Sequence, residues 1–288
     1  MRSVATAGAV LRAEFRGAPP TQPPGGLVLV TDSFACSPLF FPGGTIGDLA
    51  VSGTVNALAV SGAVPHHLSV RFTVEAGFPA GDLRRVARSM VTAAEAAGVP
   101  VAVDGVSVVR RGRVRGCAID TTGVGAGGGA HRLGAGRARP GDAVLVSGPV
   151  GEHGLAVALG ADVVSDVAPL TGLASAVLAV PGVRALREVT GGGVAAALDE
   201  IARAASVRVL LDHSAVPVTP EVRRAADHFG IDPLHAACAG CLLAVVDHAH
   251  ATTARTALRA HPRGTTASPI AHLAPHTPAD HNEQPRTT

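Results

Sequence analysis

The feature that most restricts the fold is a repeated pattern in which a short apolar run is followed within two residues by glycine or an acidic residue. Segments 27–34 (LVLVTDSF), 143–154 (AVLVSGPVGEHG) and 241–247 (CLLAVVD) all show it. Apolar runs of this length between turn residues predict buried strands, and we expect the first strand to end at an acidic turn containing Asp32. Segment 66–77 alternates as a strand should, and segments 99–109, 116–126 and 208–218 predict further strands.

Helices are predicted between these strands from apolar spacing and end signals. One helix is expected over residues 47–61, and a second is expected between an Asp82 N-cap and Gly98. In the second half, helices are predicted after Gly193, over residues 220–229 and from residue 251. Helices and strands alternate without the strict rhythm of a doubly wound sheet, so the pattern alone predicts a mixed α and β fold.

The length of 288 residues favours two domains. We expect a flexible arm over residues 1–26, because it ends in the run GAPPTQPPGG. The glycine-rich segment 125–142 predicts a boundary, which gives an N-terminal domain over residues 27–136 and a C-terminal domain over residues 137–262. The segment 263–288 is rich in Pro, His and Thr, and we expect it to be disordered, with His261, His272, His276 and His281 as solvated side chains rather than metal ligands.

Composition excludes several classes of function. All 24 basic residues are arginine, which rules out a lysine Schiff base and the lysine of a Walker A loop. Bound phosphate would then need backbone N–H groups, Arg or a metal. The net charge of +2 is spread along the chain and the aromatic residues are seven Phe, so we expect no basic patch and no nucleic-acid partner. The longest uncharged stretch, 49–70, contains polar residues and predicts a buried helix rather than a membrane span, which favours a soluble cytoplasmic protein.

Five motifs, read together and in this order, point to one family. They are TDSF with SPLFFPGGTIGDLAVSGTVNALAVSGAVP, then RPGDAVLVSGPVGEHG, TGGGVAAALDEIA and GIDPLHAACAG. Over roughly residues 27–262 the chain resembles the HypE family of NiFe-hydrogenase maturation factors, which belongs to the PurM-like superfamily related to aminoimidazole ribonucleotide (AIR) synthase. The segment SPLFFPGG distinguishes this family from its cousins, the selenophosphate synthetases and thiamine-monophosphate kinases.

The resemblance implies a PurM-like fold with an N-terminal α/β domain, whose sheet pairs with that of a second subunit in a dimer barrel, and a C-terminal α+β domain. It implies ATP and Mg²⁺ between the domains and an ATP-dependent dehydration of a thiocarboxamide to a thiocyanate for the iron cyanide ligand. The implied partners are a HypF-type carbamoyltransferase and a HypC–HypD assembly complex. The nucleotide-binding positions carried over are Asp32, Gly43, Gly44, Asn56, Thr190 and Gly192, and Asp32, Asp104 and Glu188 are carried over as metal ligands.

The chain departs from the family pattern at several of these positions. Where the family has a metal-binding Asp after Val-Asn, this chain has Ala57, and a methyl group cannot ligate Mg²⁺. Asp104 lies one position away from the family's Gly-Asp-Thr-Lys aspartate, and a shift of one residue in a strand reverses the direction of a side chain. Glu188 keeps the charge of the usual Asp. Cys238 and Cys241 stand at the usual Asn-Glu-Gly motif; they suit buried strand-end cysteines better than a redox pair or half a zinc site.

The family ends in Pro-Arg-Ile-Cys, and its terminal Cys carries the substrate. This sequence ends Gln284 to Thr288 with no Cys after Cys241, so no catalytic residue can be assigned and we expect that it cannot cyanate itself in the ordinary way. Two alternatives to an active maturation enzyme follow. One is a non-catalytic paralogue that serves as a binding or scaffold subunit, and the other is an ATP-dependent enzyme acting on a free small molecule.

Overall fold

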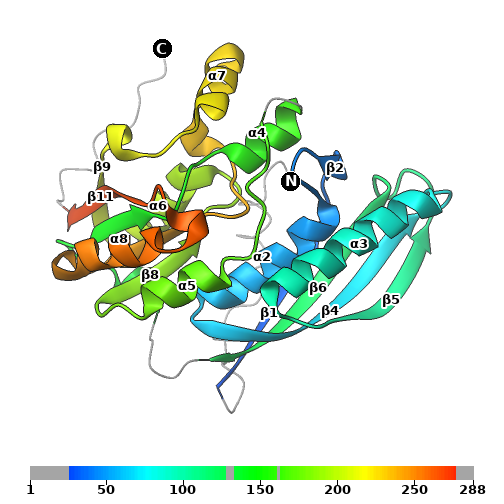
Figure 1. The fold of residues 1–288 in the computed structure, drawn as a ribbon, viewed down its shortest axis with the longest axis horizontal. Helices are drawn as coiled ribbons and strands as arrows, with labels where there is room; N and C mark the ends of the chain where they lie inside the picture. Colours follow the sequence, from blue (N-terminus) through cyan, green and yellow to red (C-terminus); the bar gives the residue numbers. More distant parts are fainter. Residues whose placement is uncertain (1–25, 128–132, 161–162, 277–288) are drawn as a thin grey trace.

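The computed structural model describes residues 26–127, 133–160 and 163–276 (Figure 1). The predicted arm over residues 1–26 lies outside this range except for Gly26. The strands are β1 (Leu27–Phe34), β2 (Phe40–Phe41), β3 (Gly44–Thr45), β4 (Ala63–Glu75), β5 (Val101–Val109), β6 (Cys117–Gly127), β7 (Ala143–Val146), β8 (Val183–Glu188), β9 (Val207–Leu211), β10 (Leu242–Val246) and β11 (Ser268–Pro275). The α-helices are α2 (Ile46–Val60), α3 (Ala80–Ala97), α4 (Glu152–Leu159), α5 (Thr171–Leu178), α6 (Gly193–Ala205), α7 (Pro220–Phe229) and α8 (Ala251–Arg259).

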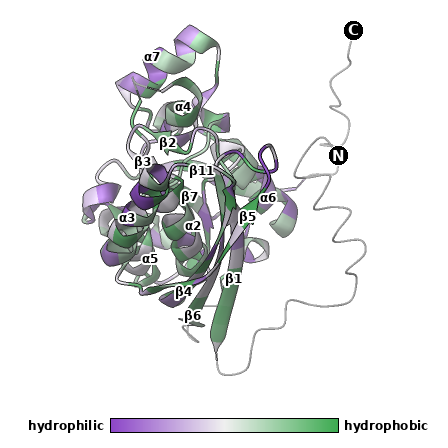
Figure 2. Ribbon diagram, turned by 90° about the vertical axis from the view of Figure 1, so that its right-hand side faces the viewer, coloured by the Kyte–Doolittle hydropathy of each residue, from purple (hydrophilic) through white to green (hydrophobic). Residues whose placement is uncertain are grey.

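The first layer is a four-stranded sheet in the order β1-β6-β4-β5, in which only β4 and β5 run parallel. Helices α2 and α3 cover one face, as Figure 2 shows with the sheet seen nearly edge-on. Leu68, Val70 and Ile119 are buried beneath these helices. The other face of the sheet carries no helix among the described residues, so its strands alternate between buried and accessible residues.

The second layer is an antiparallel sheet in the order β8-β10-β7-β11-β9. Helix α6 packs on one face with Val144 and Val146, while α5 and α8 pack on the other with Leu145. Because both faces are covered, β7 and β10 are buried at every position, and their apolar runs are therefore continuous. The sequence prediction of mixed α and β structure in a PurM-like fold is confirmed.

Helix ends show why these segments fold locally. Thr45 and Asp48 form a capping box at the start of α2, with Asp48 Oδ2 accepting from Thr45 N at 2.7 Å. The predicted end of α3 at Gly98 and the Thr219 cap of α7 are both present. The predicted Asp82 cap is wrong, because α3 already begins at Ala80, and Asp82 lies inside its first turn.

Two strand predictions are corrected by the sheet topology. Strand β1 is an edge strand rather than a buried one, and it continues past Asp32 to Phe34 because every residue from Leu27 to Phe34 pairs with β6. The region from 263 onward is not disordered as far as residue 276, because β11 inserts between β7 and β9 and buries Ile270 and Leu273. Its prolines are accommodated by an irregularity in pairing between Pro269 and Ala271. Residues 277–288, which include His281, lie outside the described range.

Within the described residues, no helix is long and apolar enough to cross a membrane.

Candidate functional site

Asp32 lies in the middle of β1 and faces helix α2. Its Oδ2 atom is buried and has no hydrogen-bond partner among the described residues. Burial raises the pKa of this carboxyl above its ordinary value, and a hydrogen bond with the Thr54 hydroxyl of α2 opposes that shift. An unpartnered buried carboxylate oxygen is costly unless a cation or a proton meets it. Asp32 therefore has the environment of a ligand-binding group rather than that of a turn residue.

Glu188 lies at the end of β8, in the second sheet, and faces Asp32 from across the domain junction. Burial, followed by the negative charge of Asp32, raises the pKa of Glu188 to about 8, although Arg187 opposes the shift. Two carboxyl groups from sequence positions 156 residues apart are thus near enough to repel each other electrostatically. The fold brings these two predicted metal ligands together.

A cavity of about 520 Å³ lies at this junction between the two sheets. Residues of β1 and α2 line one side, and Arg187, Glu200 and Ile201 line the other. Ala57 is part of the lining, so the position at which the family pattern has an aspartate faces this cavity. Asp32 and Glu188 do not line the cavity themselves, although Glu188 directly follows Arg187 of its lining. Compared with an aspartate, the alanine side chain leaves more space at this position and carries no charge.

The site was tested for its fit to Mg²⁺. No cluster of three or more His, Cys, Asp or Glu suited to a metal occurs in the described part of the chain. However, Mg²⁺ is commonly held by one or two carboxylates together with the phosphates of a nucleotide and water. Asp32, whose Oδ2 atom has no hydrogen-bond partner among the described residues, and Glu188, whose pKa is raised mainly by burial, supply two carboxyl groups at the junction. The residues present therefore fit an ion that arrives with a nucleotide, and do not by themselves form a complete metal cage.

Thr190 and Gly192 follow Glu188 directly and lead into helix α6. Gly192 is the N-cap with φ 83° and Gly193 has φ 65°, both left-handed values. At Gly193 a Cβ would meet the Leu234 carbonyl oxygen at 2.3 Å, so only glycine fits there. The exposed turn at Thr190 places the beginning of α6 beside Glu188, where free N–H groups favour an anion.

Asn56 connects the two domains. Its side chain is 1% exposed. Asn56 Nδ2 donates to the carbonyl oxygens of Ala168 at 3.1 Å and Ala239 at 3.5 Å, and Oδ1 accepts from Leu170 N at 2.7 Å. All three partners are backbone groups of the second domain. Both N–H groups of the amide are thus used within the protein, and the geometry fits a domain latch better than the nucleotide contact that the sequence predicted.

Gly43 and Gly44 contact protein rather than an open site. A Cβ at Gly43, whose φ is 91°, would lie 2.9 Å from the carbonyl oxygen of Ser165. At Gly44 it would lie 2.9 Å from Val167 Cγ1. Ser165 N also donates to Pro42 O at 2.9 Å. The two glycines allow the 39–45 segment to pack tightly on residues 164–167 of the second domain.

Asp104 is not brought to the carboxylate pair. It is the extra residue in a bulge of β5, where Val70 pairs with Val103 and Arg71 pairs with Gly105. Strands β6 and β4 separate β5 from β1. At the usual strand spacing this places Asp104 about 14 Å from Asp32, too far to share an ion within one chain.

Three polar residues near the junction have no counterpart in the sequence prediction. Thr54 lies one turn before Ala57 on α2 and contacts Asp32. The buried Asp166 carboxylate accepts from Ala239 N and Gly240 N, each at 2.9 Å, and so fixes the loop before β10. Beside it, burial and the charge of Asp166 raise the pKa of Glu152 to about 7. The sequence offers one signal for Asp166. It is the single acidic residue in segment 163–180, which otherwise consists of apolar and small residues.

Cys238 and Cys241 are 2% and 3% exposed and lie just before β10. Cys238 Sγ accepts from Gly151 N at 3.3 Å, and Cys241 Sγ lies 3.6 Å from Ser147 Oγ. The hydrogen bond with Cys241 and burial raise the pKa of Cys238 well above its usual value. Both thiols are buried and packed, as expected for structural strand-end cysteines.

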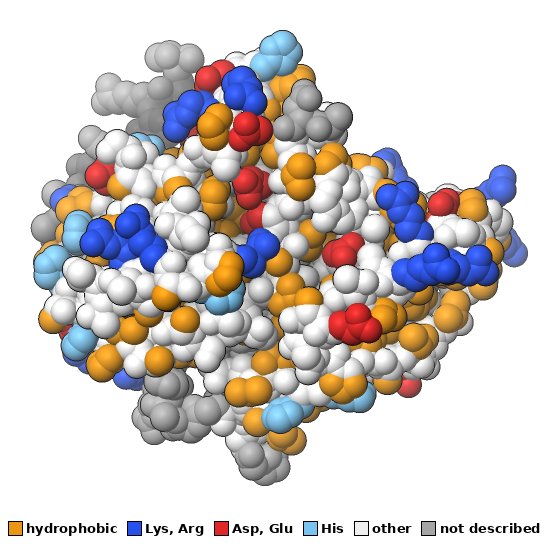
Figure 3. All heavy atoms as spheres, viewed as in Figure 1, with side chains coloured by type: hydrophobic (Ala, Val, Ile, Leu, Met, Phe, Trp, Pro, Cys, Tyr) orange, Lys and Arg blue, Asp and Glu red, His pale blue; other side chains and the backbone are white. Residues whose placement is uncertain are grey.

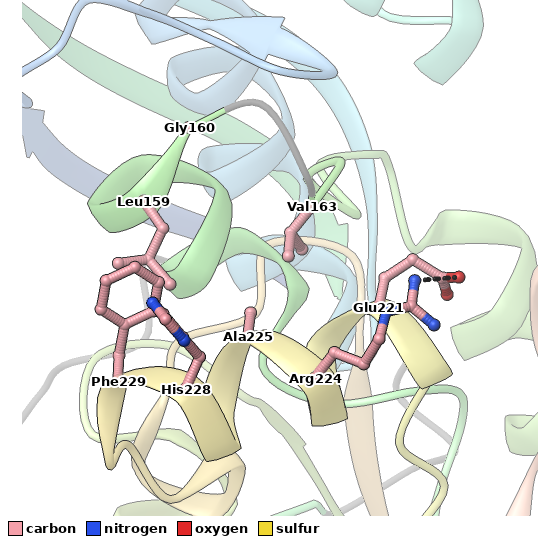
Figure 4. Close-up of a pocket in the computed structure, with 8 residues that line it drawn as sticks. All are labelled: Leu159, Gly160, Val163, Glu221, Arg224, Ala225, His228 and Phe229. Atoms are coloured by element: carbon pink, nitrogen blue, oxygen red, sulfur yellow. Dashed lines mark hydrogen bonds and ion pairs between the residues drawn. The ribbon is translucent and has the colours of Figure 1, made fainter.

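A larger cavity of about 590 Å³ lies elsewhere, between α4 and α7 (Figure 4). Leu159, Val163 and Phe229 form its apolar wall, and an exposed ion pair between Glu221 and Arg224 lies at its edge. It contains none of the predicted site residues. The domain junction near Asp32 and Glu188 remains the better candidate, because two partly buried carboxyl groups with raised pKa values face each other there.

Comparison with known proteins agrees with this fold. The domain models of AIR synthase related proteins match residues 8–126 for the N-terminal domain and 139–276 for the C-terminal domain. A carbamoyl dehydratase HypE from Rhizobium leguminosarum bv. viciae is 45% identical over 260 residues, which cover 87% of this chain and 74% of that protein. The HypE of Escherichia coli K12 is 41% identical and is covered to 76%.

Solved structures give the same result. A HypE–HypF complex superposes with a TM-score of 0.88 at 37% identity, covering 93% of each chain. A HypE in complex with ATP gives 0.84 at 38% identity, covering 91% of this chain and 81% of that one. A thiamine-monophosphate kinase complexed with AMPPCP and TMP, at 16% identity and a TM-score of 0.72, shares the fold alone. The chain belongs to the HypE family of hydrogenase maturation proteins, within the AIR synthase related superfamily.

Proposed function

We propose that this chain is a cytoplasmic hydrogenase maturation protein of the HypE type that binds ATP with Mg²⁺ between its two domains. The observation that carries the proposal is the pairing of Asp32 with Glu188, two partly buried carboxyl groups that face each other at the domain junction, with the Asp32 Oδ2 atom left without a hydrogen-bond partner among the described residues. A relative of 38% identity has been solved with ATP. Asp32 and Glu188 would hold the ion, and the start of α6 would face the phosphates.

ATP supplies a phosphoryl group that turns the poorly leaving oxygen of a thiocarboxamide into a good leaving group. The contribution of this chain is to neutralise and orient the polyphosphate in the partly buried cleft, where charge interactions are stronger than in water. We propose a HypF-type carbamoyltransferase and a HypC–HypD complex as partners. A relative has been solved in a HypE–HypF complex.

Calorimetric titration of the protein with ATP, with and without Mg²⁺, tests this proposal. Binding that requires both components is expected. Ala57 favours the second candidate, a non-catalytic scaffold, because the family pattern has a charged aspartate at this position of the cavity lining and alanine carries no charge. A scaffold of that kind would bind HypF with the same affinity whether nucleotide is present or absent, and a flat titration with ATP would decide for it.

The Ala57→Asp substitution is expected to tighten Mg²⁺-dependent ATP binding about tenfold, since it restores at the domain junction the carboxylate that the family pattern has at this position. The matched control is Ala57→Asn, which adds similar volume without charge and should leave the affinity within about twofold. Calorimetry at one pH compares the two variants. Equal effects from both would show that position 57 does not face the ion.

The affinity for ATP with Mg²⁺ is expected to rise with pH up to about 8. Glu188 has a raised pKa, so it is protonated in the free protein at neutral pH and must release that proton to bind a cation. For the same reason the free protein loses stability as the pH rises from the ordinary Glu value through about 8. Titrations in buffers of different ionisation enthalpy count the released proton, and Glu188→Gln should remove the pH dependence.

We further propose a homodimer formed through the face of the first sheet that no helix covers. Leu27, Leu29 and Val64 are 43%, 54% and 62% exposed there. Leu27 and Val64 both pair with Ala126 of β6, so these apolar side chains share one end of the face. Light scattering at micromolar concentration should give twice the chain mass, and Leu29→Glu should give the monomer mass.

A further inference from the structure

One end of the first sheet carries a group of arginines that we name the basic tip. Three arginines come from the first half of α3, and four come from the turn between β5 and β6. They are Arg84, Arg85, Arg88, Arg110, Arg111, Arg113 and Arg115, and all seven are exposed. Figure 3 shows the blue side chains gathering at this end of the molecule, over α3 and the neighbouring strand ends.

The two groups of arginines belong to one surface. Arg111 Nε donates to Ala76 O at 3.3 Å, in the segment that leads into α3. The Arg85 guanidinium lies 4.3 Å above the ring of Phe40. Leu39, the neighbour of Phe40, packs against Gly116 at the base of the β5–β6 turn. The 39–40 segment is therefore flanked by α3 on one side and by the turn on the other.

Charge is strongly segregated in this domain. Between residues 26 and 127 there are eight arginines, of which seven are at the tip, and seven acidic residues, of which Glu75 and Asp82 are at the tip. The Glu75 carboxylate accepts from the backbone N–H groups of Gly112 and Gly116, which fixes the turn. Within the described residues none of the seven arginines forms an ion pair. The sequence expectation of no basic patch is wrong, because arginines separated by more than twenty residues meet at one end of the sheet.

We infer that the basic tip is a docking surface for an acidic segment of a partner protein. The argument is charge complementarity, since seven exposed guanidinium groups without carboxylate partners are available to form paired hydrogen bonds with carboxylates. Arg85, held over Phe40, and Arg111, held by Ala76, are already ordered, which reduces the entropy lost on binding. This surface is separate from the nucleotide cleft, and the inference does not depend on ATP binding.

A protein partner fits better than a nucleic acid. Single-stranded nucleic acid needs free aromatic faces on which bases stack. At the tip, Phe40 is covered by Arg85 and Phe78 packs against Gly116, and both belong to the edge of the domain core. The protein contains no Tyr or Trp. The tip thus offers carboxylate-binding groups without a stacking platform.

Fluorescence anisotropy with labelled decaglutamate tests the inference on the full chain, beside a labelled single-stranded DNA of equal charge. The tip variant carries Arg84→Glu, Arg88→Glu and Arg113→Glu. The matched control carries Arg137→Glu, Arg139→Glu and Arg223→Glu, three exposed arginines without ion pairs in or next to the second domain. Both variants undergo the same change in formal charge, and circular dichroism checks that each is folded.

The tip variant is expected to bind decaglutamate at least about tenfold more weakly than the wild type, and the control within about threefold. Added salt should weaken wild-type binding, since exposed charges are screened over about 8 Å at physiological ionic strength. Equal losses in both variants would show an effect of net charge alone and overturn the inference. Tighter binding of the DNA than of the peptide, or no peptide binding at low salt, would also overturn it.

Discussion

Asp32→Asn is expected to weaken the affinity for ATP with Mg²⁺ about 100-fold. The substitution keeps the size of the side chain but removes the charge of the one carboxylate whose Oδ2 atom is buried without a partner. A unit charge about 4 Å from a cation contributes on the order of 4 kcal/mol at an effective dielectric constant near 20. Part of this is recovered, because Glu188 loses a repelling neighbour and ionises more readily.

The matched control for this prediction is Asp120→Asn. Asp120 lies on the adjacent strand β6, but it faces the opposite side of the sheet and accepts a hydrogen bond from Ser33 Oγ at 2.6 Å. Its replacement should change the affinity less than about threefold. In Asp32→Asn the pH at which binding reaches half of its maximum should also move down. An unchanged affinity in Asp32→Asn would contradict the placement of the ion.

Asn56→Leu is expected to lower the free energy of unfolding by about 3 kcal/mol. Leucine is similar in size, but it leaves two carbonyl groups and one N–H group of the second domain without their partner. Leaving a buried polar group without its hydrogen bond costs about 1–3 kcal/mol. The carbonyl groups of Ala168 and Ala239 both lose the same donor, the amide nitrogen of Asn56. Urea unfolding followed by circular dichroism measures the change.

Ser61→Ala on the same helix is the control for the Asn56 substitution. Ser61 Oγ donates to Leu58 O at 2.6 Å, within its own helix end, and makes no link to the second domain. A loss of about 0.5–1 kcal/mol is expected there. If Asn56→Leu cost no more than Ser61→Ala, the amide would not be holding the domains together.

The sequence predicted those parts of the fold that depend on local signals. The capped helix α7, from Thr219 to Gly230, and the glycine at the end of α3 follow from side-chain chemistry within a few residues. Asp32 and Glu188 were assigned as metal ligands because they stand in motifs that carry the family resemblance, and that role stays a prediction. Their pairing was not visible from spacing, because it depends on how two sheets pack.

The errors share a physical cause, which is tertiary context. Tertiary context also gives Asn56 three backbone partners more than 110 residues away, which nothing in its sequence neighbourhood reveals, while its nucleotide-binding role stays a prediction. Strand β11 was missed because its prolines and histidine resemble a coil, whereas burial between β7 and β9 selects the extended form. The basic tip was missed because net charge averages over regions that the fold separates.

The position of β11 has a consequence for how the polypeptide is made. This strand is the last described element, yet it lies inside the second sheet with β7 on one side and β9 on the other. During synthesis the first sheet is complete once β6 has left the ribosome, whereas β9 lacks its neighbour until residues 268–275 emerge. Between the synthesis of β9 and that of β11 the nascent chain thus presents a folded first half together with an open strand edge, which is a template for pairing with other chains.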